Sequence, residues 1–96
     1  MRLSKLIIKI LKTNIQKSFG KDTLYLFGSR TDDTKRGGDI DLAVDSNLSR
    51  LEFRQKKIKF FTMLTKIDFN YKVDLVNFNT NDILLHQEIQ INHIKL

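Results

Sequence analysis

The sequence contains no cysteine, no proline and no tryptophan, and only four of its 96 residues are glycine. Without cysteine, the chain has no disulfide, no thiolate zinc site and no cysteine nucleophile, so we expect a protein of the reducing cytoplasm. An unbroken apolar run near the length of a bilayer span is also missing, and basic residues interrupt the apolar ones at the N-terminus. We therefore expect neither a membrane anchor nor a cleaved signal peptide.

Acidic side chains are in the minority, with 11 against 17 basic ones and a net charge of +6. This balance favours polyanionic partners such as a nucleoside triphosphate, a nucleic acid or an acidic protein. Much of the excess falls on predicted helices, where a solvated polar face explains it equally well. Because no aromatic platform with interleaved basic residues is evident, we expect no direct nucleic-acid binding. His86 and His93 have no obvious carboxylate partner in the sequence, and we expect them at surface or interface positions.

Apolar periodicity predicts a helix, two strands and a loop in the N-terminal half. Apolar residues recur at helical spacing over residues 3–19, and Gly20 is placed to end that helix. Residues 23–27 have no polar alternation, which predicts a central strand covered on both faces. The charged, glycine-containing residues 30–38 predict a loop. Residues 39–44 then alternate as a strand, with the apolar side chains on one face and two aspartates on the other.

The C-terminal half completes a small α/β (α+β) fold, in which helices pack on a mixed sheet of three or four strands. Ser49 and Glu52 have the spacing of a capping box, and the apolar stripe of a second helix follows over residues 53–67. The length suffices for one core, so we predict a single domain over residues 1–96. The remaining predicted elements are a strand over residues 72–78, a helix that Asn79 or Thr80 caps and that ends near Ile91, and an edge strand in the tail to Leu96.

Three aspartates form a candidate metal site. Asp39 and Asp41 face the same way on one strand, about 6.6 Å apart at the backbone, so both can reach a pair of divalent ions. Hard carboxylate oxygens select Mg²⁺, or alternatively Mn²⁺. On the third strand Asp74 stands between Val73 and Leu75, so its side chain points away from their apolar face. If the two strands are neighbours, the three carboxylates are expected to converge.

A phosphate-binding corner is predicted where the first strand ends, at Gly28, Ser29 and Arg30. Glycine lets the backbone approach a phosphate closely, the serine hydroxyl and the following amides donate to its oxygens, and arginine grips it with two parallel hydrogen bonds. Residues 35–38 add positive charge and glycine beside the acidic pair. This composition suits a loop that closes over a nucleotide, and it suits an ordinary solvated turn equally well.

These motifs, in the segments of residues 26–30, 39–42 and 73–75, together resemble the minimal nucleotidyltransferases of the DNA polymerase beta superfamily, over nearly the whole chain. The resemblance implies that Gly28 and Ser29 hold the triphosphate of a nucleotide. It also implies that Asp39 and Asp41 bind two Mg²⁺ ions and that Asp74 assists as a ligand or a base. The interval between the serine and the first aspartate is at the short end of the family's pattern, which bears on the geometry of the loop.

The resemblance also implies a function. Minimal nucleotidyltransferases are typically antitoxins paired with HEPN-domain ribonuclease toxins, and active members transfer AMP from ATP to a tyrosine of the toxin. We therefore expect a Mg²⁺-dependent nucleotidyltransferase that forms a hetero-oligomer with such a toxin. Two alternatives stay open. One is transfer to a small molecule, as in aminoglycoside nucleotidyltransferases, although those carry an additional helical domain. The other is a non-enzymatic module that neutralises its partner by covering it.

Overall fold

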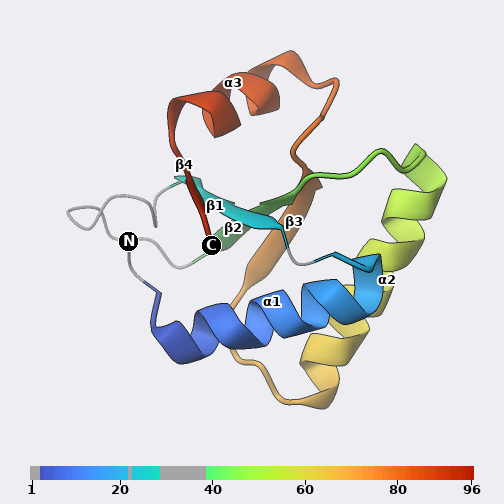
Figure 1. Ribbon diagram of the computed structural model, residues 1–96, viewed down its shortest axis with the longest axis vertical. Helices are drawn as coiled ribbons and strands as arrows, with labels where there is room; N and C mark the ends of the chain where they lie inside the picture. Colours follow the sequence, from blue (N-terminus) through green and yellow to red (C-terminus); the bar gives the residue numbers. More distant parts are fainter. Residues whose placement is uncertain (1–2, 22, 29–38) are drawn as a thin grey trace.

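Three helices pack on a four-stranded mixed sheet in the computed structural model, which describes residues 3–21, 23–28 and 39–96 (Figure 1). This architecture confirms the α/β (α+β) class predicted from the sequence. In chain order the elements are α1 (Lys5–Phe19), β1 (Leu24–Phe27), β2 (Ile40–Val44), α2 (Arg50–Lys66), β3 (Val73–Asn77), α3 (Ile83–Ile91) and β4 (His93–Lys95).

The sheet has the strand order β3-β2-β1-β4. β1 pairs antiparallel with β2 and with β4, whereas β2 and β3 are parallel and are joined by the crossover helix α2. The predicted central position of β1 and the predicted edge strand in the tail are both confirmed. The parallel pairing aligns Asp41 with Asp74, so two of the candidate site residues are direct neighbours across the sheet.

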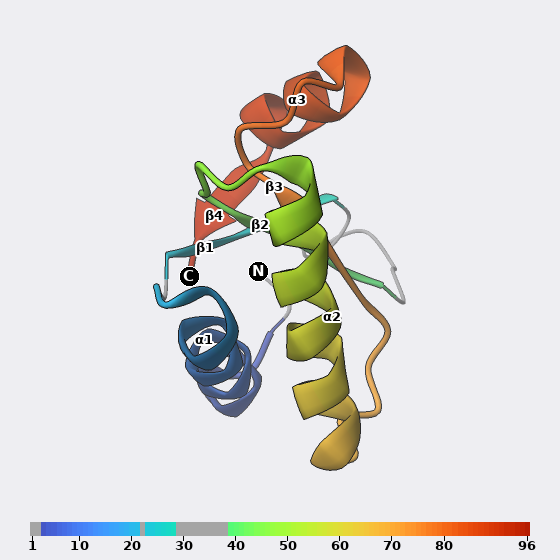
Figure 2. The same ribbon diagram turned by 90° about the vertical axis from the view of Figure 1, so that its right-hand side faces the viewer.

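Helices α1 and α2 cover one face of the sheet, and α3 lies on the other face (Figures 1 and 2). Alternate residues of each strand point to opposite faces, which divides the apolar side chains between two clusters. The larger cluster lies under α1 and α2 and includes Leu11, Ile15, Leu24, Leu26, Ile40, Leu42, Val44, Phe60, Leu64 and Leu75. The smaller cluster lies under α3 and contains Phe27, Ala43 and Ile89.

The predicted stop of α1 at Gly20 and the predicted cap of α2 at Ser49 are confirmed. Gly20 ends α1 in the left-handed conformation, with φ of 78°. Ser49 caps α2, because its Oγ accepts a hydrogen bond from the Glu52 N–H at 3.2 Å and donates one to the Glu52 carboxylate at 2.9 Å. Ile67 was expected in the apolar stripe of α2, but α2 ends at Lys66, so Ile67 is its C-cap and is 52% exposed.

The predicted cap of α3 is wrong. Asp82, rather than Asn79 or Thr80, caps this helix and accepts a hydrogen bond from the Leu85 N–H at 3.1 Å. The Thr80 hydroxyl accepts a hydrogen bond from the Asp82 N–H at 3.1 Å. This bond forms the turn that leads into the helix. In the part of the chain that the structure describes, no helix is long and apolar enough to cross a bilayer.

Candidate active site

Asp39 and Asp41 lie at the start of β2. Asp39 is the exposed residue directly before the strand, and Asp41 is its partly buried second residue. Because Ile40 and Leu42 on either side of Asp41 are fully buried under α1 and α2, the Asp41 side chain lies on the opposite face, which also carries α3. The strand therefore directs one partly desolvated carboxylate toward the α3 side of the sheet.

Asp74 lies on β3 directly beside Asp41, so the two strands are neighbours as the convergence of the carboxylates requires. One oxygen of the Asp74 carboxylate, however, is engaged by other groups. This oxygen, Oδ1, accepts a hydrogen bond from the Leu75 N–H at 2.9 Å and lies 3.5 Å from Nζ of Lys57. Within the described residues, no group of three or more acidic, histidine or cysteine side chains is arranged to hold a metal ion. The expected gathering of three carboxylates is thus absent from this arrangement, in which Lys57 and the Leu75 amide engage Oδ1 of Asp74.

Negative charge is concentrated around Asp41. Burial raises the pKa of Asp41 above its ordinary value, and the charges of Asp74, Asp39 and Glu88 raise it further. Lys72 lies 3.8 Å from the Asp39 carboxylate, but both side chains of this pair are more than half exposed, at 82% and 54%. An ion pair this exposed contributes little. Among the three aspartates of the candidate site, Asp41 is therefore the one whose ionised form a bound cation would stabilise most.

Gly28 completes this corner from β1. The end of β1 places Phe27 opposite Asp41, and Gly28 follows with a positive φ of 79°. A Cβ at this position would lie 2.6 Å from Oδ2 of Asp41, so a side chain there would force that carboxylate to shift. The sequence predicted Gly28 as a place where backbone approaches a phosphate, and the structure adds that it borders the candidate metal ligand.

Ser29 and Arg30, the other two residues of the predicted phosphate corner, lie outside the described residues, as does the loop of residues 30–38. The described part of the corner is thus made by Gly28 and Asp41. Asp39, Asp41 and Asp74 offer only carboxylate oxygens, which is the donor chemistry that Mg²⁺ and Mn²⁺ prefer. The residues present therefore fit a divalent cation by chemistry and by charge, provided that Asp74 leaves Lys57.

Three charged neighbours of the site were not predicted. Lys72 precedes β3 as Asp39 precedes β2, so their proximity follows only once the parallel register is known. Lys57 reaches Asp74 from α2, and Glu88 acts on Asp41 from α3. Helical periodicity places these residues on helices but does not give the packing of those helices on the sheet, so the sequence carries no signal for either contact.

Both histidines are at exposed positions, as expected. Nδ1 of His93 lies 2.8 Å from the Ile89 carbonyl, and the His93 ring contacts the rings of Tyr25 and Phe78 edge to face. His93 thus packs on aromatic side chains of the smaller cluster, on the face of the sheet that carries α3.

Comparison with known proteins agrees with this geometry. The sequence profile of the family described as polymerase beta, nucleotidyltransferase matches residues 5–96. Comparison with curated proteins gives no match. A similar solved chain belongs to the crystal structure of a mutant of the toxin–antitoxin MntA-HpeT, with 27% identity, a TM-score of 0.54, and coverage of 95% of this chain and 68% of that one. Another belongs to a crystal structure of a toxin–antitoxin with AMP-PNP, with 27% identity, a TM-score of 0.55, and coverage of 93% and 68%.

Proposed function

This chain belongs to the polymerase beta nucleotidyltransferase family, and from that premise we propose that it transfers AMP from ATP to a protein hydroxyl. The acceptor is a tyrosine of a partner toxin, a ribonuclease of the HEPN type, so that the chain acts as an antitoxin in a hetero-oligomer with that toxin. The observation that carries this proposal is the corner in which Gly28 makes room for Asp41 beside Asp74. The similarity to chains from toxin–antitoxin structures, one of them with the nucleotide AMP-PNP, supports the choice of partner and nucleotide.

The proposed reaction is an in-line displacement at the α-phosphorus of ATP. The acceptor oxygen forms a new bond to that phosphorus, the bond between the α-phosphorus and its bridging oxygen breaks, and pyrophosphate leaves. Asp39 and Asp41 would hold Mg²⁺, with Asp74 as a further ligand or as the base. When bound, Mg²⁺ supplies Lewis-acid stabilisation of the charge on the phosphate oxygens.

The chain's own residues have distinct parts in this proposal. Gly28 lets the backbone at the end of β1 lie close to the Asp41 carboxylate, and we assign a phosphate of the nucleotide to this corner. Ser29 and Arg30 follow it in the sequence, and we assign them the β- and γ-phosphates. Asp74 is exposed at the edge strand β3, where a hydroxyl of another protein can reach it, and it receives the proton of that hydroxyl.

The test is transfer of labelled AMP. The chain is incubated with Mg²⁺, ATP labelled at the α-phosphate, and the protein encoded by the neighbouring reading frame, and both proteins are then analysed by intact mass and peptide mapping. We expect the label on a tyrosine of the partner, together with release of pyrophosphate, and no label with Asp41→Asn. Label on neither protein, with a chain that is folded and binds ATP, would contradict the proposed transfer.

A further inference from the structure

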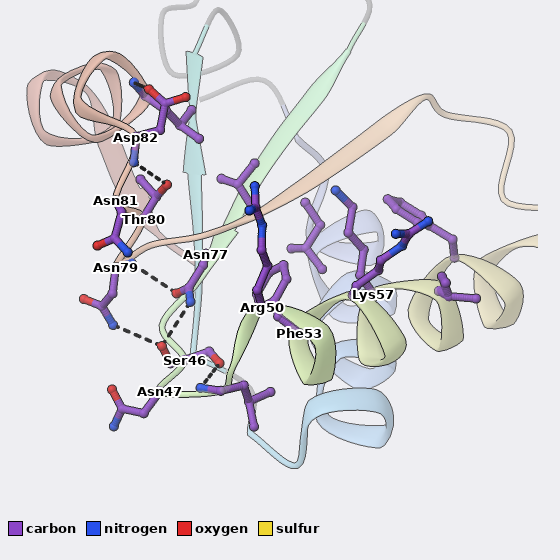
Figure 3. A pocket seen from close by; sticks show the side chains of 17 residues that line it. Ser46, Asn47, Arg50, Phe53, Lys57, Asn77, Asn79, Thr80, Asn81 and Asp82 are labelled. Carbon is purple, nitrogen blue, oxygen red and sulfur yellow. Dashed lines mark hydrogen bonds between the residues drawn. The ribbon is translucent and has the colours of Figure 1, made fainter.

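A groove of about 1010 Å³ lies beside the outer edge of β3, between α2 and the start of α3 (Figure 3). Its apolar floor includes Phe53 and Phe61 of α2 and Leu75 of β3. These three side chains also pack on the larger core cluster, so the floor is a fixed part of the fold. Neither its walls nor its floor include Asp39 or Asp41, which makes the groove separate from the predicted nucleotide corner.

One wall of the groove is cationic. Arg50, Arg54 and Lys57 line it from α2 at the spacing i, i+4 and i+7, which places them on one face of that helix. Among the lining residues Asp82 is the one acidic side chain, and its carboxylate is engaged in capping α3. The opposite wall carries uncharged amides and hydroxyls, which come from Ser46, Asn47, Asn77, Asn79, Thr80 and Asn81. The groove therefore favours an anionic occupant.

The direction of the backbone groups of β3 indicates which conformation that occupant has. The Ile40 N–H donates to the Lys72 carbonyl, and the Phe78 N–H donates to the Val44 carbonyl. Because the backbone groups of alternate strand residues point the same way, residues 74 and 76 also face β2, whereas residues 73, 75 and 77 face away from it. In the sheet formed by the described strands, β3 is an edge strand. Its outward backbone groups are thus turned to the groove, where an extended peptide can pair with the outward carbonyls and with the Asn77 N–H, while the Leu75 N–H donates to Oδ1 of Asp74.

We propose that this groove binds an extended, acidic segment of the acceptor protein, which adds to the edge of β3 and places its carboxylates against Arg50 and Arg54. A peptide continues the backbone pairing of the sheet, and a nucleic acid does not. The aromatic rings of the floor are half-buried in the core, which leaves them poorly placed to stack with bases. The groove thus fits an acidic peptide better than a nucleic acid.

This inference rests on the proposed function in one respect, namely that the groove delivers the acceptor hydroxyl to the active site. Lys57 lines the groove and lies 3.5 Å from Oδ1 of Asp74, so the two sites meet at this ion pair. An acidic side chain of the bound segment would compete for Lys57 and release Asp74. Docking in the groove would in this way bring the hydroxyl to Asp74 and free that carboxylate at the same time.

The test uses a fluorescein-labelled random copolymer of glutamate and tyrosine, which is acidic, extended and rich in hydroxyl acceptors. Its binding to the chain is measured by fluorescence anisotropy without nucleotide. We expect the double variant Arg50→Glu/Arg54→Glu to bind at least about tenfold more weakly than the unchanged chain, because both close charge pairs become repulsive. The control Lys59→Glu/Lys66→Glu makes the same change in net charge at exposed positions of α2 outside the groove, and it should bind within about twofold of the unchanged chain.

Each outcome decides the question. Equal binding by the two double variants would overturn the groove assignment. Tighter binding of a labelled oligouridylate, lost in the Arg50→Glu/Arg54→Glu variant, would assign the groove to a nucleic acid and overturn the peptide. Since binding is measured without ATP, a chain that holds the copolymer in the groove but transfers no AMP to the partner protein would count against the proposed function and leave the groove inference supported.

Hydrogen exchange tests the strand addition separately. Bound copolymer should slow exchange of the outward amide of Asn77, which can then donate to the added strand. The outward amide of Leu75 already donates to Oδ1 of Asp74, so it is not used as a readout. The inward amides of Asp74 and Val76 already face β2 and serve as the internal reference. Binding that depends on Arg50 and Arg54 without any protection at Asn77 would overturn the strand addition.

Discussion

Gly28 and Asp41 approach each other so closely that a Cβ at residue 28 would lie 2.6 Å from Oδ2 of the aspartate. The pairing of β1 with β2 produces this contact, because Gly28 directly follows Phe27, the partner of Asp41. Gly20 has nearly the same backbone conformation, with φ of 78° against 79°, but nothing lies within 4 Å of the Cβ it would carry. Gly20 therefore has the strain of a left-handed backbone alone. Gly28 combines the same backbone conformation with crowding of the Asp41 carboxylate.

Replacing each glycine by alanine tests whether the contact of residue 28 with Asp41 matters for the reaction. We expect Gly20→Ala to lower the free energy of unfolding by about 1 kcal/mol through backbone strain alone. Gly28→Ala should cost at least as much and should also displace the Asp41 carboxylate, so that it loses most of its AMP transfer while Gly20→Ala keeps it. Urea unfolding and the transfer assay measure the two effects. Equal activities in variants of matched stability would show that the contact with Asp41 has no bearing on the reaction.

The charge of Asp41 makes stability depend on pH. Its pKa is raised in the folded chain, first by burial and then by Asp74, Asp39 and Glu88, so the folded state holds its proton more tightly than the unfolded state does. The stability that protonated Asp41 contributes is fully present below the ordinary aspartate pKa and is lost as the pH rises through the raised value. Asp41→Asn cannot ionise, so in the presence of EDTA at pH 7 we expect its Tm to be higher by about 2–5 °C.

Thermal melts at pH 7 and near pH 4 check this prediction, since the advantage of Asp41→Asn should shrink on acidification. The control Asp68→Asn removes the same charge from an exposed residue in the turn after α2, at a positive φ that asparagine tolerates. A gain of equal size in that control would assign the effect to net charge, and no gain in Asp41→Asn would contradict the charge cluster.

Lys57 lies 3.5 Å from Oδ1 of Asp74, and this contact also leads to a prediction. We expect Lys57→Met to bind Mn²⁺ about two- to fivefold more tightly, because Asp74 no longer has a competing cation. Stability should change little, since the Asp74 side chain of this pair is 61% exposed. Titration followed by the electron paramagnetic resonance signal of free Mn²⁺ measures the affinity. Lys59→Met removes a charge from an exposed position of the same helix and should leave that affinity unchanged. Weaker binding by Lys57→Met would refute competition.

The helices and strands were predictable from the sequence because the spacing of apolar residues marks them, and chemical signals mark the ends of some of the helices. Gly20 and the pair of Ser49 and Glu52 are such signals, and their geometry is as predicted. The cap of α3 was wrong because several adjacent polar residues can all cap a helix. Which one does so depends on where the chain leaves β3, and that is set by tertiary packing.

The candidate site was predictable only in part, for a similar reason. The positions of Asp41 and Asp74 on one face follow from strand alternation together with the parallel register. The direction of the Asp74 carboxylate does not follow from this pattern, because a lysine 17 residues earlier on another element decides it. Side-chain direction at the edge of a sheet depends on the helix that packs there, and periodicity gives no information about that packing.

The last prediction separates catalysis from simple covering of the toxin. Asp39 is exposed and precedes β2, and its side chain has no part in either core cluster, so Asp39→Ala should preserve the fold and any docking surface. If neutralisation requires AMP transfer, the variant should still bind the partner but should leave its ribonuclease active, because loss of a metal ligand removes stabilisation of several kcal/mol at the transition state. A ribonuclease assay beside mass spectrometry of the partner measures both effects. Stoichiometric inhibition by Asp39→Ala, with no change in the partner's mass, would instead make this chain a non-enzymatic antitoxin.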